Sequence, residues 1–151
     1  MCLYLKDKKP KIAKRNIVCY KILNRTRRFN WTTDRVEEAY ITPYQHTPIN
    51  LVNDDIIEGI RCFEPDSSTS DISPISPNLD FLHTEGWKWV MHGGCIHSYR
   101  YKKDANFMWS DAGQVIFKCI IPKGTEYYEG IDGIHQKNYA SKKIRFVKQI
   151  K

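Results

Sequence analysis

Two histidines and a cysteine lie close together in one stretch of the chain, where they could bind a metal ion. His92, Cys95 and His97 follow the pattern H-x-x-C-x-H, and both residue types are zinc ligands in proteins. The spacing matches no established metal motif. On a strand, Cys95 and His97 would share one face and leave His92 without a fixed partner. We therefore expect no metal site, with His92 in a turn and His97 in a strand.

Covalent catalysis needs a nucleophile within hydrogen-bond reach of a base. Cys95 and His97 are two residues apart, and on a strand that spacing separates the side chains by roughly 6–7 Å, which is too far for direct contact. The chain has no G-x-S-x-G motif, which positions the serine of many hydrolases. It also lacks a complete G-x-x-x-x-G-K-[ST] phosphate loop. Enzymes of these classes are not indicated.

An acidic residue, Glu126, follows the most apolar run of the chain and stands beside Tyr127 and Tyr128. A carboxylate in that position could serve a sugar or nucleotide site as an acid or a base. The alternative is a solvated turn residue without a chemical role. The spacing alone leaves both interpretations open.

Basic residues alternate with aromatic residues near both ends of the chain. This is the composition of a groove that stacks bases and pairs with phosphates. No RNP, KH or zinc-finger pattern accompanies it, so the acidic partner could be a nucleic acid, a nucleotide or an acidic protein. The candidate binding residues are Tyr20, Lys21, Arg25, Arg27, Arg28, Lys142, Lys143 and Arg145.

The net charge of +7 is unevenly distributed along the chain. Residues 1–28 have a net charge of +9 and residues 137–151 have +6, whereas residues 29–136 have −8. If the two ends converge in space, they form a strongly positive face. The alternative is that they are solvated tails and strand edges, where lysine blocks unwanted edge pairing.

Length and composition favour a single domain over residues 1–151. The chain is 41% hydrophobic and 13% aromatic, which is enough to form a core. It has no apolar stretch of the roughly 20 residues that a membrane span needs, and residues 1–11 lack the apolar region of a secretory signal. The five cysteines are odd in number and have no C-x-x-C spacing, which disfavours disulfides and favours a cytoplasmic location. We expect no cofactor and no membrane partner.

Apolar and β-branched runs separated by glycine and proline predict an α+β domain, with a mostly antiparallel sheet of five or more strands and one or two short helices. Gly93 and Gly94 predict a hairpin between the second and third strands. The last strand is expected at a sheet edge, and Gly124 is expected to have positive φ in a turn. The expected strands cover residues 16–23, 87–91, 95–101, 114–122 and 143–150.

Two short helices and one long loop complete the expected elements. Asp34 followed by Glu37 resembles a capping box and predicts a helix over 34–40. A second helix is expected over 102–109, with Ala105, Phe107 and Met108 partly buried. Residues 64–80 are rich in serine and proline, which predicts a flexible surface loop within the domain.

The sequence resembles two groups of proteins. It is similar to small uncharacterised proteins of gut bacteria and their phages over about half of its length, in the stretches IVCYKI, CIHSY, VIFKCIIPKGTEYYEG and YASKKIRF. The order of these stretches also resembles the ADP-ribosyltransferase fold. That resemblance implies a nicotinamide-dinucleotide cleft, although the first strand lacks the Arg or His that those enzymes carry. The implied cleft residues are Tyr20, His97, Ser98, Tyr99 and Glu126 or Glu129.

Two hypotheses of different classes follow. The first is a small binding protein whose basic face engages an acidic partner. The second is a nucleotide-dependent enzyme with catalytic residues His97, Ser98, Tyr99 and Glu126. The first rests on the counted charge asymmetry, and the second rests on fold analogy alone.

Overall fold

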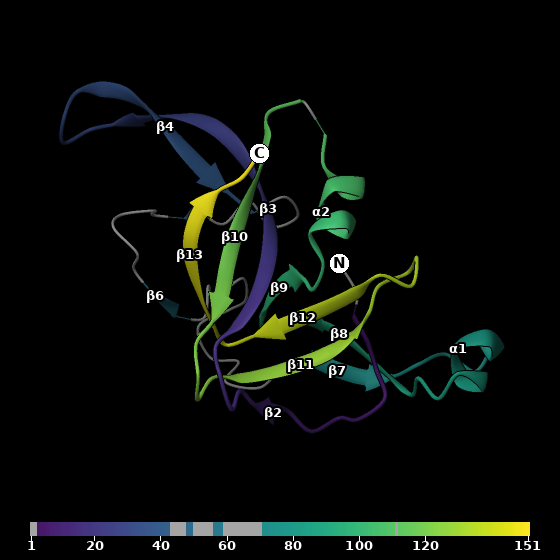
Figure 1. Cartoon of the computed structure of the whole chain (residues 1–151). Helices are drawn as coiled ribbons and strands as arrows, with labels where there is room; N and C mark the ends of the chain where they lie inside the picture. The colour runs from purple at the N-terminus through teal and green to yellow at the C-terminus, as the bar shows by residue number, and fades with distance from the viewer. Residues whose placement is uncertain (1–2, 43–47, 50–55, 59–70, 111) are drawn as a thin grey trace.

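A computed structural model describes residues 3–42, 48–49, 56–58, 71–110 and 112–151 (Figure 1). The two helices are α1 (Asp80–Thr84) and α2 (Lys102–Met108). The strands are β1 (Leu3–Leu5), β2 (Lys11–Ile12), β3 (Ile17–Asn30), β4 (Arg35–Ile41), β5 (Pro48–Ile49), β6 (Ile56–Glu58), β7 (Asp71–Pro74), β8 (Trp89–Gly93), β9 (Ile96–Tyr99), β10 (Gln114–Ile121), β11 (Glu126–Ile131), β12 (Lys137–Ser141) and β13 (Lys143–Gln149).

All strands of the described residues belong to one antiparallel sheet. Its main order is β6-β13-β10-β3-β9-β12-β11-β1-β8-β7, with β2 joined to β11, β4 to β3, and β5 to β4. The expectation of a mostly antiparallel, sheet-rich fold is confirmed, and the two helices are short. The label α+β therefore applies only in the coarse sense that two short helices accompany a large sheet.

The strand β10 is central, as the apolar run predicted. It pairs with β3 over eight residues and with β13 on its other side. The turn that follows it contains Gly124 at φ 88°, which confirms the positive φ expected there. Among the described residues, the buried side chains of β3, β10 and β13 form the largest part of the main core cluster.

The helix expected over residues 34–40 is wrong, because this segment is the strand β4. Asp34 has φ 55° and lies in the turn between β3 and β4 instead of capping a helix. Seven consecutive residues of β4 pair with β3, so its main-chain groups are satisfied by a neighbouring strand. The local capping signal is outweighed by this pairing.

The hairpin expected around Gly93 and Gly94 is also wrong. Gly94 has φ 91° and turns the chain, but the strands on either side of it do not pair with each other. Instead, β8 pairs with β1 and β7, while β9 pairs with β12 and β3. The N-terminal strand therefore takes the place that the hairpin partner was expected to occupy.

Two further expectations are corrected at the ends of the sheet. The strand β13 is not an edge, because β6 pairs with it on the side away from β10. Of the predicted loop 64–80, residues 64–70 lie outside the described residues. Asp71–Pro74 form β7, which pairs with β8, so the last part of this stretch belongs to the sheet. Proline has no main-chain N–H to donate. It is tolerated there because β7 is the last strand in the order and forms main-chain hydrogen bonds with a neighbour on one side only.

The helix expected over residues 102–109 is confirmed as α2. Ala105 is buried against β3 and β9 with Ile22, Tyr99 and Ile116. Phe107 was expected to be partly buried but is 74% exposed. No helix in the described part of the chain is long and apolar enough to cross a membrane.

Candidate functional site

Three neighbouring strands of the sheet contain no acidic residue. They are β3, β10 and β13, with the sequences IVCYKILNRTRRFN, QVIFKCII and KIRFVKQ. The strand β10 lies between the other two. The strand β3 of the basic N-terminal part and the strand β13 of the basic C-terminal part are therefore only two strand spacings apart, roughly 10 Å. The fold therefore brings strands from both ends of the chain into one region, where the cations that face outward come from β10 and β13.

Side chains on these strands alternate between a buried side and an outer side. Cys19, Cys119 and Phe146 share one row and are buried in the main core. The rows on either side of it point outward. One outward row joins Tyr20, Lys118 and Lys148, and the other joins Val18, Ile120 and Arg145. We call these six residues the sheet face.

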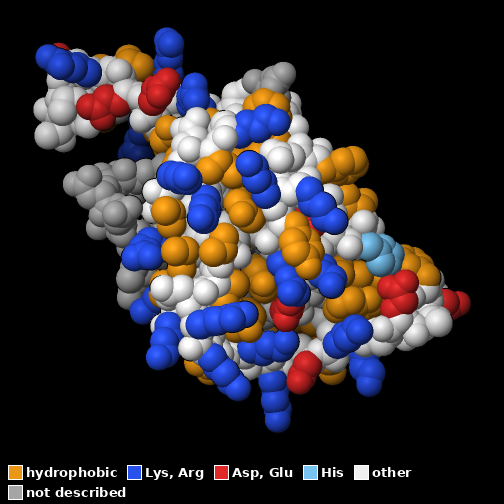
Figure 2. Space-filling model, in the orientation of Figure 1, with side chains coloured by type: hydrophobic (Ala, Val, Ile, Leu, Met, Phe, Trp, Pro, Cys, Tyr) orange, Lys and Arg blue, Asp and Glu red, His pale blue; other side chains and the backbone are white. Residues whose placement is uncertain are grey.

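The sheet face is partly open to solvent, and Tyr20 packs with part of its surface against the buried cluster of Ile22, Tyr99, Ala105 and Ile116. The α2 helix covers the next outward row, which contains Ile22 and Ile116, and Figure 1 shows no helix in front of β10 and β13. Val18 is 43% exposed, and Lys148 is also exposed. Figure 2 shows basic and hydrophobic side chains interspersed over β10 and β13 without acidic ones among them.

The three cations of the sheet face are not neutralised within the described part of the chain. The ion pairs found there involve other cations: Lys11 and Arg100 with Glu129, and His135 with Glu85. The sheet face therefore combines an aromatic ring and two aliphatic side chains with three positive charges that no described acid pairs with. This arrangement can hold an anion that also has an apolar surface.

Two of the eight predicted binding residues, Tyr20 and Arg145, lie on the sheet face. Lys143 lies two residues before Arg145 in β13 and pairs in register with Glu58. Lys142 lies at the corner between β12 and β13, and its Nζ atom is 3.5 Å from the main-chain oxygen of Gly94. The C-terminal part of the predicted set thus lies on or beside one edge of the sheet face.

Lys21 was predicted to bind a ligand, but its side chain points into the core. It is 8% exposed, and Nζ donates a hydrogen bond of 2.6 Å to the main-chain oxygen of His97. The strands β3 and β9 share a single register pair, Tyr20 with Tyr99, so main-chain acceptors of β9 need another donor. Lys21 supplies it, which explains why a lysine occupies an otherwise apolar position.

Arg25, Arg27 and Arg28 lie apart from the sheet face, on the hairpin that projects at the upper left of Figure 1. Arg27 pairs in register with Glu38, and Arg28 pairs with Glu37. The acids of β4 therefore offset the arginines of β3. This hairpin is nearly balanced in charge, and Figure 2 shows red side chains beside blue ones on it.

The four predicted catalytic residues do not form a cluster. His97 and Tyr99 point to one side of β9, whereas Ser98 lies between them in the strand, is 3% exposed and points to the other side. Glu126 is exposed at the start of β11, which is separated from β9 by β12. Two strand spacings of roughly 10 Å place Glu126 beyond hydrogen-bond reach of His97.

The chemistry of His97 also argues against a role as a base. Its Nδ1 atom is buried without a hydrogen-bond partner in the described part of the chain. Burial and the nearby positive charge of Lys21 lower the pKa of His97 to about 3. An imidazole with such a low pKa is a weak proton acceptor at neutral pH. No group of three or more potential metal ligands occurs among the described residues.

Sequence reasoning missed Lys118 and Lys148, which complete the sheet face. One signal could have found Lys118, because it is the only charged residue in the apolar run of β10. Burying a charge without a partner is costly, which favours an outward direction for Lys118 and for its neighbours in the same row. Lys21 on β3 is buried, but there it has the main-chain oxygen of His97 as an acceptor.

Comparison with known proteins adds no residue to this candidate site. No family model, no curated protein and no solved structure matches the chain. The site is therefore defined by its geometry and charge.

Proposed function

We propose that this protein binds single-stranded nucleic acid on the sheet face. The observation that carries the proposal is the pair of outward rows, in which Tyr20 lies next to Lys118, while Lys148 and Arg145 follow on β13, and no acid is present. Phosphates would contact the three cations, and a base would stack on the Tyr20 ring. Stacking on an aromatic ring does not depend on base identity, so we expect little sequence preference.

Single strands fit this surface better than the other acidic partners. The bases of a duplex are stacked on each other, so they cannot use an aromatic ring on an open sheet. An acidic protein would use the cations but would gain no stacking from Tyr20. The contribution of Tyr20 therefore separates single-stranded nucleic acid from an acidic protein surface.

The test is the binding of a labelled single-stranded oligonucleotide of about 12 nucleotides, followed by fluorescence anisotropy at several salt concentrations. Three phosphate contacts predict that log K falls with log salt with a slope of about −2. The double variant Lys118→Gln/Lys148→Gln should reduce the magnitude of that slope by about 1.4. Tyr20→Leu should weaken binding by about 1–3 kcal/mol and leave the slope unchanged.

A matched control is the double variant Arg27→Gln/Arg28→Gln, which removes the same charge from the hairpin. It should bind like the wild type, because Glu37 and Glu38 lie opposite these arginines. The proposal is wrong if binding does not depend on salt, or if the hairpin variant loses as much affinity as the sheet-face variant. It is also wrong if Tyr20→Leu binds as tightly as the wild type.

The alternative function, a nucleotide-dependent enzyme, has no specific observation in its favour. It requires His97, Ser98, Tyr99 and Glu126 to act together, and these residues lie on different faces and strands. We therefore base the proposal on binding.

A further inference from the structure

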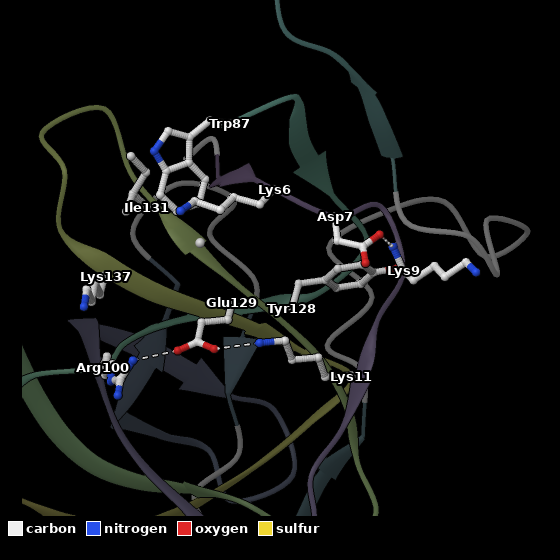
Figure 3. Close-up of a pocket in the computed structure, with 11 residues that line it drawn as sticks. Lys6, Asp7, Lys9, Lys11, Trp87, Arg100, Tyr128, Glu129, Ile131 and Lys137 are labelled. Carbon is white, nitrogen blue, oxygen red and sulfur yellow. Dashed lines mark hydrogen bonds and ion pairs between the residues drawn. The ribbon is translucent and has the colours of Figure 1, made fainter. Parts of the chain in front are cut away.

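A pocket of about 370 Å³ lies between the N-terminal segment and the strands β11 and β12 (Figure 3). Segments far apart in the sequence supply its basic side chains. Lys6, Lys9 and Lys11 come from the N-terminal segment, Arg100 follows β9, and Lys137 begins β12. None of these residues belongs to the sheet face.

The pocket exists because the N-terminal segment arches over β11. Tyr4 of β1 pairs with Ile131, and Lys11 of β2 pairs with Tyr127, so both ends of the arch are joined to the same strand. Gly130 lies beneath the first end of the arch, where a Cβ atom would collide with the main-chain oxygen of Tyr4. A glycine at this position lets the arch approach closely and sets the floor of the pocket.

Cations outnumber acids around the pocket. Glu129 accepts from Lys11 at 3.0 Å and from Arg100 at 2.7 Å, and Figure 3 shows it between them. Asp7 accepts a hydrogen bond from the main-chain nitrogen of Lys9 through Oδ1 and so holds the turn of the arch. Five basic and two acidic side chains line the pocket, which leaves a net charge of +3.

Two of the remaining cations are available to a ligand. No acid in the described part of the chain pairs with Lys6 or Lys137, whereas Figure 3 shows the side chain of Lys9 directed away from these cations. The Nζ atom of Lys6 lies 4.8 Å from the ring centre of Trp87, at the pocket's apolar rim. Ile131 and Gly130 add further apolar surface beside these cations. The pocket thus offers one strongly basic region and one apolar region.

We propose that this pocket binds an organic diphosphate ester such as a nucleoside diphosphate. A diphosphate ester has about three negative charges at neutral pH, which matches the excess charge of the pocket. Its organic part would lie against Trp87 and Ile131. The volume is within the range of small-molecule sites. The site is independent of the proposed nucleic-acid binding, because it uses different residues.

Isothermal titration calorimetry at low salt with ADP, inorganic pyrophosphate and adenosine tests the proposal. ADP should bind, pyrophosphate should bind more weakly because it has no organic part, and adenosine should not bind. Lys6→Gln and Lys137→Gln should each weaken ADP binding about tenfold. Both side chains are exposed, so neither change threatens folding. Glu129→Gln should tighten ADP binding several-fold, because it releases Lys11 and Arg100 from their shared carboxylate.

Lys123→Gln is the matched control, because Lys123 is exposed in a turn outside the pocket; it should leave ADP binding unchanged. The proposal is overturned if ADP does not bind, if pyrophosphate binds as tightly as ADP, or if Lys6→Gln and Lys137→Gln behave like Lys123→Gln. The variant Lys118→Gln/Lys148→Gln should retain ADP binding. An ADP affinity lost in that variant would contradict the assignment to the pocket.

Discussion

Lys21 reaches from the core side of β3 to the main-chain oxygen of His97, across a hydrogen bond of 2.6 Å. This contact lies where β3 and β9 share only one register pair. It therefore supports the junction between the part of the sheet around β10 and the part around β12.

Replacing Lys21 should weaken this junction. In Lys21→Met the apolar side chain fits the core, but the carbonyl of His97 loses its charged donor. An unsatisfied buried acceptor costs about 1–3 kcal/mol, and we expect the free energy of unfolding in urea to fall by that amount. Lys118→Met on the neighbouring strand is the control, because that side chain points outward, and it should change stability by less than about 0.5 kcal/mol. Equal stability of both variants would contradict the structural role of Lys21.

The stability of the fold should fall as the pH is lowered below the ordinary pKa of histidine. The pKa of His97 is lowered by burial, and further by Lys21, from 6.5 in the unfolded chain to about 3 in the folded one. Between these values the unfolded state binds a proton that the folded state excludes. Stability is therefore retained above pH 6.5 and lost progressively toward pH 3, by at most about 1.4 kcal/mol per pH unit from this group.

Urea unfolding at pH 7 and pH 5 measures this effect. The variant His97→Gln cannot take up the proton, so its stability should depend less steeply on pH over the same interval. If wild type and variant show the same pH dependence, the low pKa of His97 is refuted.

The two free cysteines that lie opposite each other in the core should not react in the native protein. Cys19 and Cys119 occupy the same register position on β3 and β10 and are fully buried. Burial raises the pKa of Cys19 to about 12 and also raises that of Cys119, so the reactive thiolate is suppressed at neutral pH. Iodoacetamide labelling followed by peptide mass spectrometry should find both residues unmodified in buffer and modified in denaturant. Labelling of either one in native buffer at the rate of an exposed thiol would contradict this assignment.

Gly130 should be required for the packing of β1. An added Cβ atom would meet the main chain of β1 at Tyr4, which cannot move as a side chain could. We expect Gly130→Ala to lower the free energy of unfolding by about 1–3 kcal/mol. Because the N-terminal segment would be displaced, the variant should also bind ADP more weakly. Gly133→Ala is a close control, because nothing lies within 4 Å of the corresponding Cβ position. Similar melting temperatures for the two variants would disprove the close approach.

Much of the fold could be predicted from local patterns. The runs that became β3 and β10 are apolar and β-branched, and a segment of this kind forms a strand in the core of almost any sheet. The α2 helix was predicted for a similar local reason. In contrast, β4 depended on pairing with the preceding strand β3, and β8 and β9 found partners distant in sequence, namely β1 for β8 and β3 and β12 for β9. A helix-capping pattern contributes about 1 kcal/mol, less than the pairing of several residues with another strand.

The charge of the candidate surfaces was determined by the sequence, but their location was not. Residues 8–33, 112–125 and 133–151 contain no acid, and this absence makes any surface that they share positive. Only the tertiary structure decided that Lys21 points inward while Tyr20 and Lys118 point outward, because a shift of one residue in strand register reverses the direction of every side chain. The pocket depends on the crossing of β1 over Gly130, a contact between residues far apart in the chain that no local pattern encodes.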